Sequence, residues 1–320
     1  MSLAACLLAY SLAVAVLGPP LLDRLTRSGV APRLGVAVWT MAMGSVVASW
    51  VGAVGLLGVE LYRAWGQVDL LLAGCFATLR AWVDGGHGGF LQAGLEVLIA
   101  LTVLAMALLA GRLVAALRRA GRDTRRHAEA AVLATRGAPR GPGGTLVVDA
   151  AQRSVYCLAG RSPAIVITRG ALDALDDTQL AAVLAHERAH LTGHHHQLLA
   201  FTSALAKILP GLRLFTEGTT QIGRLVEMRA DDVAAHRHGG HTVVDALLAL
   251  TIGTTVPASA LGAATEPGIA DRVERLLFPL DRARSRLTQS AVLGALLLVP
   301  AITAIIVLTG SPLCLTPFSA

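Results

Sequence analysis

Long runs of apolar residues, separated by short polar segments, dominate the hydrophobic pattern of this chain. A helix needs roughly 20 mostly apolar residues to cross a bilayer, and four of the runs are long enough. Membrane-spanning helices are therefore predicted at residues 3–22, 34–61, 90–117 and 287–308. Pro19 and Pro20 are expected to shorten the regular part of the first helix, because proline lacks the backbone N–H that a helix uses.

Two further apolar stretches do not fit a span. Residues 70–79 are too few to cross a bilayer, so residues 62–89 are predicted to form an outer segment between the second and third spans. Residues 243–263 are long enough but include Asp245 and Pro257. A span there would also place the arginines before the last span on the wrong side of the membrane. This stretch is therefore predicted to be a buried core helix.

The segment between the third and fourth spans, residues 118–286, has the mixed pattern of a folded domain. It begins with a polar helix rich in Arg and Ala that continues the third span as far as residue 135. Runs of β-branched residues then predict short strands, and apolar residues at helical spacing predict helices. The strands are expected at residues 145–148, 155–158 and 164–168, and the later helices at 197–209, 219–237 and 241–252.

One helix of this domain has clear signals at both ends. Asp176 can cap its N-terminus, with Gln179 three residues on as the reciprocal partner. Gly193 can end it. Because strands precede this helix and further helices follow it, the domain is predicted to have an α+β fold.

The composition narrows the class of protein. Of the 320 residues, 54% are hydrophobic and 15% are charged, whereas soluble domains carry about 25% charged residues. A fully soluble enzyme and a disordered chain are therefore both excluded. The four cysteines are far apart and form no CxxC pair, which argues against a disulfide scaffold and against a cysteine zinc knuckle.

The arginines predict an orientation in the membrane. Loops in the cytoplasm carry an excess of Arg and Lys, and each Arg-rich segment of this chain flanks a predicted span. The three segments can all be cytoplasmic if both termini and residues 62–89 lie outside and residues 118–286 lie inside. A position beside the membrane also explains the net charge of +6 without nucleic acid, so no direct nucleic-acid binding is expected. The Arg-rich segments are residues 24–33, 118–126 and 282–286.

The capped helix carries the sequence His186-Glu187-Arg188-Ala189-His190. Histidines four residues apart lie on the same face of a helix, where two neutral imidazoles can bind one zinc ion. The glutamate between them can then act as general base toward the water on the metal. The spacing therefore predicts one zinc ion per chain, with His186 and His190 as ligands and Glu187 as the catalytic residue.

The third protein ligand has two main candidates. His196 fits the metzincin spacing HExxHxxGxxH, and Glu227 begins an ExxxD pattern on a later predicted helix. Metzincins also need a methionine turn, but Met228 lies inside a helical pattern, so Glu227 is favoured and His196 remains the alternative metal ligand. Asp231, one turn after Glu227, can hydrogen-bond the nitrogen of a histidine ligand that faces away from the metal and so fix its tautomer. Glu217 is a weaker candidate.

The segments AIVITRGALDALDDTQLAAVLAHERAHLTGHHH and EMRADDVAA resemble the membrane-embedded gluzincin metallopeptidases. These include the HtpX and CAAX-protease type and the BlaR/MecR antirepressor type. The resemblance implies that His186, His190 and Glu227 bind zinc and that Glu187 is the base. It also implies that an edge strand pairs with an extended substrate peptide. That strand would contain Ile165, Val166, Ile167 and Thr168.

The order of three spans, a domain and one span is most similar to the BlaR/MecR group. It implies a mainly α multi-pass protein of the plasma membrane, with four transmembrane helices. A cytoplasmic α+β zincin-like (gluzincin) domain is inserted between the third and fourth. The expected units are residues 1–117, 118–286 and 287–320. Because only residues 311–320 follow the last span, the penicillin-binding sensor domain of that group is expected to be absent.

The expected partners are the lipid bilayer and a peptide or protein substrate. By the same resemblance, the substrate is a winged-helix repressor of the BlaI/MecI kind, cleaved in response to a signal. Three alternatives stay open. The chain could be a quality-control protease of the HtpX type, a non-catalytic membrane receptor or scaffold with a zinc-binding domain, or a metal sensor that uses the histidines at residues 194–196.

Overall fold

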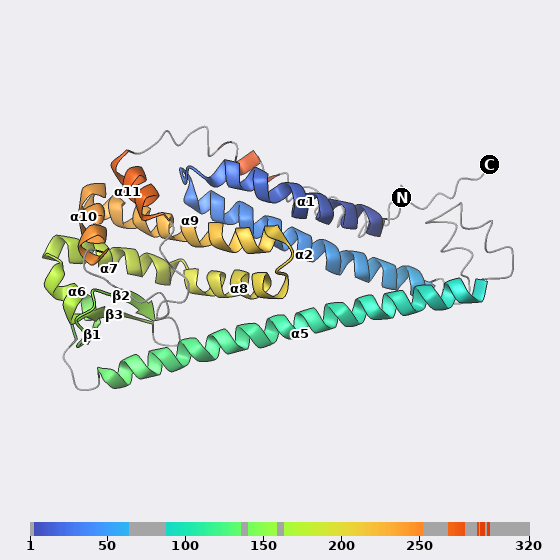
Figure 1. Ribbon diagram of the computed structural model, residues 1–320, viewed down its shortest axis with the longest axis horizontal. Helices are drawn as coiled ribbons and strands as arrows, with labels where there is room; N and C mark the ends of the chain where they lie inside the picture. The colour runs from blue at the N-terminus through green and yellow to red at the C-terminus, as the bar shows by residue number, and fades with distance from the viewer. Residues whose placement is uncertain are drawn as a thin grey trace.

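A computed structural model of the chain describes residues 3–63, 88–135, 140–158, 163–251 and 268–278, with 287, 289–291 and 293–294. These residues form a mostly helical molecule with a small sheet at one end (Figure 1). The first three helices are α1 (Leu3–Thr26), α2 (Pro32–Arg63) and α5 (Gly88–Ala134). The strands are β1 (Leu146–Val148), β2 (Val155–Leu158) and β3 (Ala164–Thr168). The remaining helices are α6 (Arg169–Ala174), α7 (Asp177–Thr192), α8 (His195–Ile208), α9 (Arg213–His238), α10 (Gly240–Thr251) and α11 (Ile269–Leu277).

Three of the described helices are long and apolar enough to cross a membrane: Ala4–Thr26, Pro32–Val59 and Leu101–Arg126. They correspond to the first three predicted spans. The fourth predicted span lies almost entirely outside the described residues, as do most of the outer segment 62–89 and the tail. The apolar stretch at 243–263 is described only as far as Thr251, where α10 buries Val243, Val244 and Ala246 as a core helix should.

The first helix does not shorten at its prolines, contrary to expectation. It continues through Pro19 and Pro20 to Thr26, and Leu22 and Thr26 beyond the prolines are buried. The Thr26 hydroxyl donates a hydrogen bond to the Leu22 carbonyl oxygen at 2.8 Å and accepts one from the Trp39 indole at 3.1 Å. Packing of α1 against α2 therefore outweighs the loss of backbone donors at the prolines.

The sheet has the strand order β1-β3-β2, in which β3 pairs parallel with β1 and antiparallel with β2. The expectation that Ile165, Val166, Ile167 and Thr168 form an edge strand is therefore wrong, because β3 is the central strand. Both Val166 and Ile167 are fully buried, and a strand without an exposed face is favoured in the middle of a sheet. Among the described strands, the edges are β1 and β2.

Helix α7 links the sheet to the rest of the molecule. Its predicted N-terminal capping box is confirmed: the Asp176 carboxylate accepts hydrogen bonds from the backbone N–H groups of Thr178 and Gln179, and the Gln179 side-chain oxygen accepts one from the Asp176 backbone N–H. Gly193 is the C-cap. The leucine and valine side chains of α7 pack on the sheet, whereas its small Ala182 and Ala185 pack beside Ala234 of α9. The small residues allow α7 and α9 to approach closely.

Helix α9 also packs against the apolar helices. Its Leu214, Phe215 and Leu225 form one buried cluster with Trp39 and Met43 of α2. The domain is thus built directly on α1 and α2, with α9 lying between them and α7 (Figure 1).

Candidate metal centre

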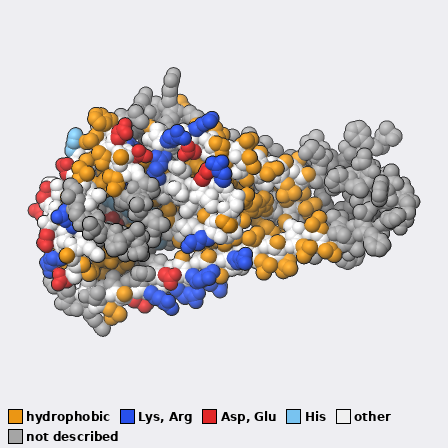
Figure 2. Space-filling model, viewed as in Figure 1, with side chains coloured by type: hydrophobic (Ala, Val, Ile, Leu, Met, Phe, Trp, Pro, Cys, Tyr) orange, Lys and Arg blue, Asp and Glu red, His pale blue; other side chains and the backbone are white. Residues whose placement is uncertain are grey.

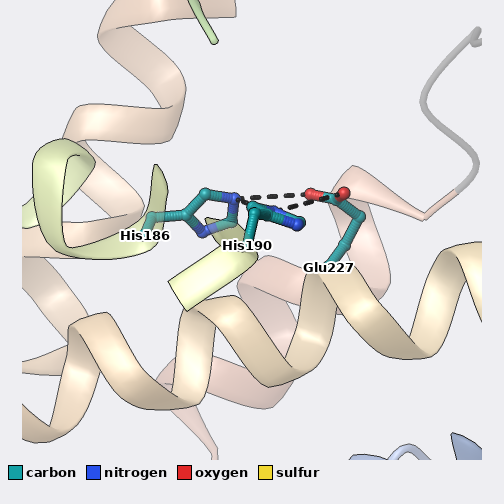
Figure 3. Close-up of side chains that lie close together, drawn as sticks. All are labelled: His186, His190 and Glu227. Carbon is teal, nitrogen blue, oxygen red and sulfur yellow. Dashed lines mark hydrogen bonds and ion pairs between the residues drawn. The ribbon is translucent and has the colours of Figure 1, made fainter. Parts of the chain in front are cut away.

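Three side chains with metal-binding atoms converge where α7 and α9 meet. The Nε2 atoms of His186 and His190 are 3.0 Å apart. Glu227 of α9 points its carboxylate at both, with Oε2 3.4 Å from His186 Nε2 and Oε1 3.5 Å from His190 Nε2 (Figure 3). One potential ligand atom from each residue lies within 4.8 Å of the others. The structure therefore brings together the two histidines and the glutamate that the sequence analysis favoured.

The outer nitrogen of His186 faces Asp231. The distance from His186 Nδ1 to Asp231 Oδ1 is 3.1 Å, and the Asp231 side chain is 0% exposed. Burial opposes ionisation of Asp231, but hydrogen bonds from Arg272 and His186 hold its pKa below the ordinary value. A buried carboxylate in this position orients the imidazole and fixes which nitrogen carries the proton.

Arg272 of α11 completes this arrangement, and the sequence analysis did not single it out. Its Nε donates to Asp231 Oδ2 at 2.7 Å and its Nη2 donates to Asp231 Oδ1 at 2.8 Å, which makes a two-pronged ion pair. Arg272 Nη1 also lies 3.7 Å from Glu227 Oε2. No spacing rule links an arginine to a carboxylate 41 residues earlier, so no local signal could have found it.

The outer nitrogen of His190 faces a third histidine, His195, at the start of α8. The two Nδ1 atoms are 2.9 Å apart and the rings meet edge to face at 86°. Burial and the neighbouring His190 and Arg229 lower the pKa of His195 to about 4, so its ring is neutral at physiological pH. His196, the alternative metal ligand by sequence spacing, does not belong to the group around Glu227.

The charges around the cluster favour a cation at its centre. Burial alone would lower the pKa of His186, but hydrogen bonds to Asp231 and Glu227 raise it to about 10. Burial likewise opposes ionisation of Glu227, yet hydrogen bonds from His186 and His190 hold its pKa well below the usual value. Two imidazole nitrogens and one carboxylate, with both outer nitrogens already bonded, form a donor set that suits zinc. The residues present therefore fit this metal.

Glu187 lies next to this cluster but is not one of its three members. Burial raises the pKa of its carboxyl group, and the nearby His186 and His190 oppose that effect. Burial raises the pKa of the Cys157 thiol on β2 to about 12, and the negative charge of the nearby Glu187 adds to this effect. Cys157 is a half-buried free cysteine. Glu187 thus lies between the histidines and strand β2.

The weaker ligand candidate lies elsewhere. Glu217 accepts a hydrogen bond from Arg213 at 2.7 Å, near the start of α9, and it does not belong to the group around Glu227.

Comparison with family models gives one match, to peptidase family M48, over residues 120–279. The match begins in the polar half of α5, ends just after α11 and contains every residue of the cluster. Neither the curated proteins nor the solved structures gave a match. Peptidases of family M48 are zinc-dependent. Since the family model covers half of the 320 residues, the chain belongs to peptidase family M48 and is a metallopeptidase.

Proposed function

We propose that this chain is an integral-membrane zinc endopeptidase whose active site faces the cytoplasm. The observation that carries the proposal is the convergence of His186, His190 and Glu227, with Glu187 beside them and each imidazole held from behind. A purely structural metal site does not need a further carboxyl group next to its ligands, as Glu187 provides here. The membrane part of the proposal rests on the three long apolar helices.

In the proposed site, His186, His190 and Glu227 would hold one zinc ion. When bound, the metal would supply Lewis acidity to polarise the scissile carbonyl group and to lower the pKa of the attacking water. Glu187 removes the proton from the attacking water and later delivers it to the leaving amine. The raised pKa of Glu187 suits this double role, because a group that both takes and gives a proton works best with a pKa near the working pH. Asp231 keeps His186 in the correct tautomer.

We assign the pairing with substrate to β2 rather than to β3. Strand β2 is paired on one side only among the described strands, and it lies against α7, close enough for Glu187 to raise the pKa of the Cys157 thiol. An extended peptide could add to the open edge of β2 through backbone hydrogen bonds. The peptide bond to be cleaved would then pass close to Glu187.

The proposed orientation is supported by where the Arg-rich segments lie. The loop between α1 and α2 contacts α9 and α11, so residues 24–33 lie at the same end of the apolar helices as the domain. Gln289, near the start of the predicted fourth span, donates a hydrogen bond to the Leu25 carbonyl oxygen at 3.1 Å. Figure 2 shows hydrophobic side chains over the part that extends away from the domain, with Lys and Arg side chains bordering it. By the positive-inside rule, the domain is cytoplasmic.

We further propose that the natural substrate is a winged-helix transcriptional repressor, cleaved in response to a signal. The similarity in layout to the BlaR/MecR group favours this substrate, and the extensive contact between α9 and the apolar helices offers a route for a signal to the site. Quality control of membrane proteins is the competing role.

The first test is catalysis by the full chain in detergent. Wild type should contain one zinc ion per chain and cleave peptides. Glu187→Gln should keep its zinc, and its kcat should fall by a factor of about 10²–10⁴, the usual contribution of a general acid-base catalyst. Glu217→Gln, which changes an exposed glutamate at the far end of α9, is the matched control and should stay active. A wild type without stoichiometric zinc, or a Glu187→Gln variant that cleaves equally well, would refute the proposal.

The second test identifies the substrate. Glu187→Gln is expressed in cells as a trap, and the proteins bound to it are identified by mass. Enrichment of one small winged-helix repressor, relative to Glu217→Gln, supports the proposed role. Enrichment of misfolded membrane proteins instead would assign the chain to quality control.

A further inference from the structure

The chain turns sharply between α7 and α8 in a way that places one ring. His194 has a φ of 51°, a left-handed conformation that is uncommon for residues other than glycine. Gly193 has no room for a side chain, because a Cβ atom there would collide with the His195 ring. As a result the ring of His195 folds back onto α7 and is only 1% exposed. The turn therefore determines the position of His195 rather than that of its neighbours.

The contact between His195 and His190 constrains both rings. His190 directs Nε2 toward His186 and Glu227, and Nδ1 toward His195. A nitrogen that binds a cation needs a free lone pair, so the proton of a neutral imidazole must sit on the other nitrogen. His190 Nδ1–H then donates to His195 Nδ1 at 2.9 Å, and His195 accepts.

We propose that His195 is a positioning residue that fixes the tautomer and ring orientation of His190. This inference rests on the proposed zinc-binding role of His190. His195 would do for His190 what Asp231 does for His186, but with a neutral acceptor in place of a carboxylate. The two halves of the site would then differ: one imidazole is backed by an anion that is paired with Arg272, and the other by a second imidazole.

The other possible role for His195, as a ligand, fits the structure less well. Its Nδ1 is engaged with His190, and its Nε2 is buried without a hydrogen-bond partner among the described residues. It does not belong to the group formed by His186, His190 and Glu227. A buried histidine that uses only one nitrogen, and uses it on a candidate ligand, is best explained as a support for that ligand.

The test measures zinc affinity of the full chain in detergent by competition with a chelator. His195→Leu removes the acceptor and should weaken zinc binding by about 10–100-fold, the usual effect of losing an outer partner of a metal ligand. The unfolding temperature of the metal-free protein should not fall, because leucine also removes a buried nitrogen that has no hydrogen-bond partner among the described residues. If His195→Leu does not fold, His195→Phe replaces it, since phenylalanine keeps a ring without an acceptor.

A conservative variant and a neighbouring histidine provide the controls. In His195→Asn, the side-chain oxygen can take the place of Nδ1, so most of the zinc affinity should return. His196→Leu and His196→Asn should bind zinc as wild type does, because His196 is outside the cluster.

The possible results separate failure of the proposed function from failure of the proposed role of His195. If wild type binds no zinc, the proposed function falls and this inference falls with it. If wild type binds zinc and the variant without the acceptor binds it equally tightly, only the role of His195 is refuted. The role is also refuted if His195→Asn binds no better than His195→Leu, or if His196→Leu loses as much affinity.

Discussion

At the scale of single residues, the burial of an ion pair decides how much the protein is destabilised when one partner is removed. Arg272 and Asp231 form an ion pair whose side chains are 6% and 0% exposed, and Asp231 also faces His186. Arg213 and Glu217 form a pair at the same 2.7 Å distance, but their side chains are 75% and 37% exposed. A buried pair is costly to break because the remaining charge is left without a partner, whereas an exposed pair exchanges its partner for water.

We therefore expect Arg272→Met to lower the free energy of unfolding by about 3–5 kcal/mol, since it leaves the Asp231 carboxylate uncompensated in the interior. Arg213→Met should change it by only about 0–1 kcal/mol. Both values can be measured by titrating a denaturing detergent into the protein in mixed micelles. Equal effects of the two substitutions would mean that the Arg272–Asp231 pair does not act as a buried ion pair.

At the scale of elements, α7 combines three tasks in sixteen residues. Its capping box fixes where the helix starts, its apolar residues attach it to the sheet, and its alanines let α9 come close enough to bring Glu227 to the histidines. The start of the helix therefore sets the direction in which both histidines point. Asp176 is the residue that holds this start.

The cap should give the protein a specific dependence on pH. Hydrogen bonds from the Thr178 side chain and the Gln179 backbone lower the pKa of Asp176 below its ordinary value of 3.8. A carboxyl group with a lowered pKa in the folded state stabilises the fold above its unfolded pKa, and this stabilisation is lost as the pH falls through the folded value. Asp176→Ala should therefore unfold at a lower temperature than wild type at neutral pH, and the difference should shrink below about pH 3.8.

Thermal unfolding of both proteins across this pH range tests the expectation. Asp173→Ala, which removes an exposed aspartate that does not cap a helix, is the control and should show no comparable difference at neutral pH. A difference between wild type and Asp176→Ala that stays constant down to strongly acidic pH would contradict the role of the Asp176 carboxylate.

At the scale of the whole molecule, the loop between α1 and α2 is held by the helices that carry the site. Arg224 of α9 donates to the carbonyl oxygens of Thr26 at 3.0 Å and Arg27 at 2.8 Å. Arg275 of α11 donates to the carbonyl oxygen of Gly29 at 2.8 Å. The Arg224 side chain of α9 and the Arg275 side chain of α11 thereby join the backbone between the first two apolar helices to the part of the molecule that holds the candidate metal centre.

Gly29, in the loop between α1 and α2, packs closely against α9. Its φ is 61°, and a Cβ atom there would collide with the sulfur of Met228, the residue after Glu227. Gly29→Ala should therefore destabilise the protein by about 1–3 kcal/mol through backbone strain and overpacking. It should also reduce peptidase activity, because Met228 would have to move. Gly44→Ala meets no atom within 4 Å and should be tolerated. Thermal unfolding and peptide cleavage check both variants. Wild-type stability and activity of Gly29→Ala would show that the contact between Gly29 and Met228 does not constrain the protein.

Several features of this protein could be predicted because their signals are local. The apolar runs predicted the long helices, and Asp176 with Gln179 predicted the start of α7. The spacing of His186 and His190 placed them on one helical face. The ExxxD pattern then favoured Glu227 over His196, and Glu227 is the residue that lies beside the two histidines.

Other features depended on contacts between distant parts of the chain. The sequence reasoning placed β3 at an edge of the sheet, although β1 and β2 enclose it. The metzincin spacing pointed to His196 as a ligand and gave no separate role to His195 beside His190, because spacing along the chain does not reveal which ring a tight turn buries. The sequence reasoning also did not find Arg272.

The sequence by itself therefore determined the apolar helices, the capped helix and the HExxH chemistry, since each follows from backbone hydrogen bonding and side-chain periodicity within a few turns. Only the tertiary structure decided which strand has an open edge, which histidine lies against His190 and which arginine pairs with Asp231. These pairings join residues from separate elements, and they form only when the packing of α7, α9 and α11 has brought those elements together.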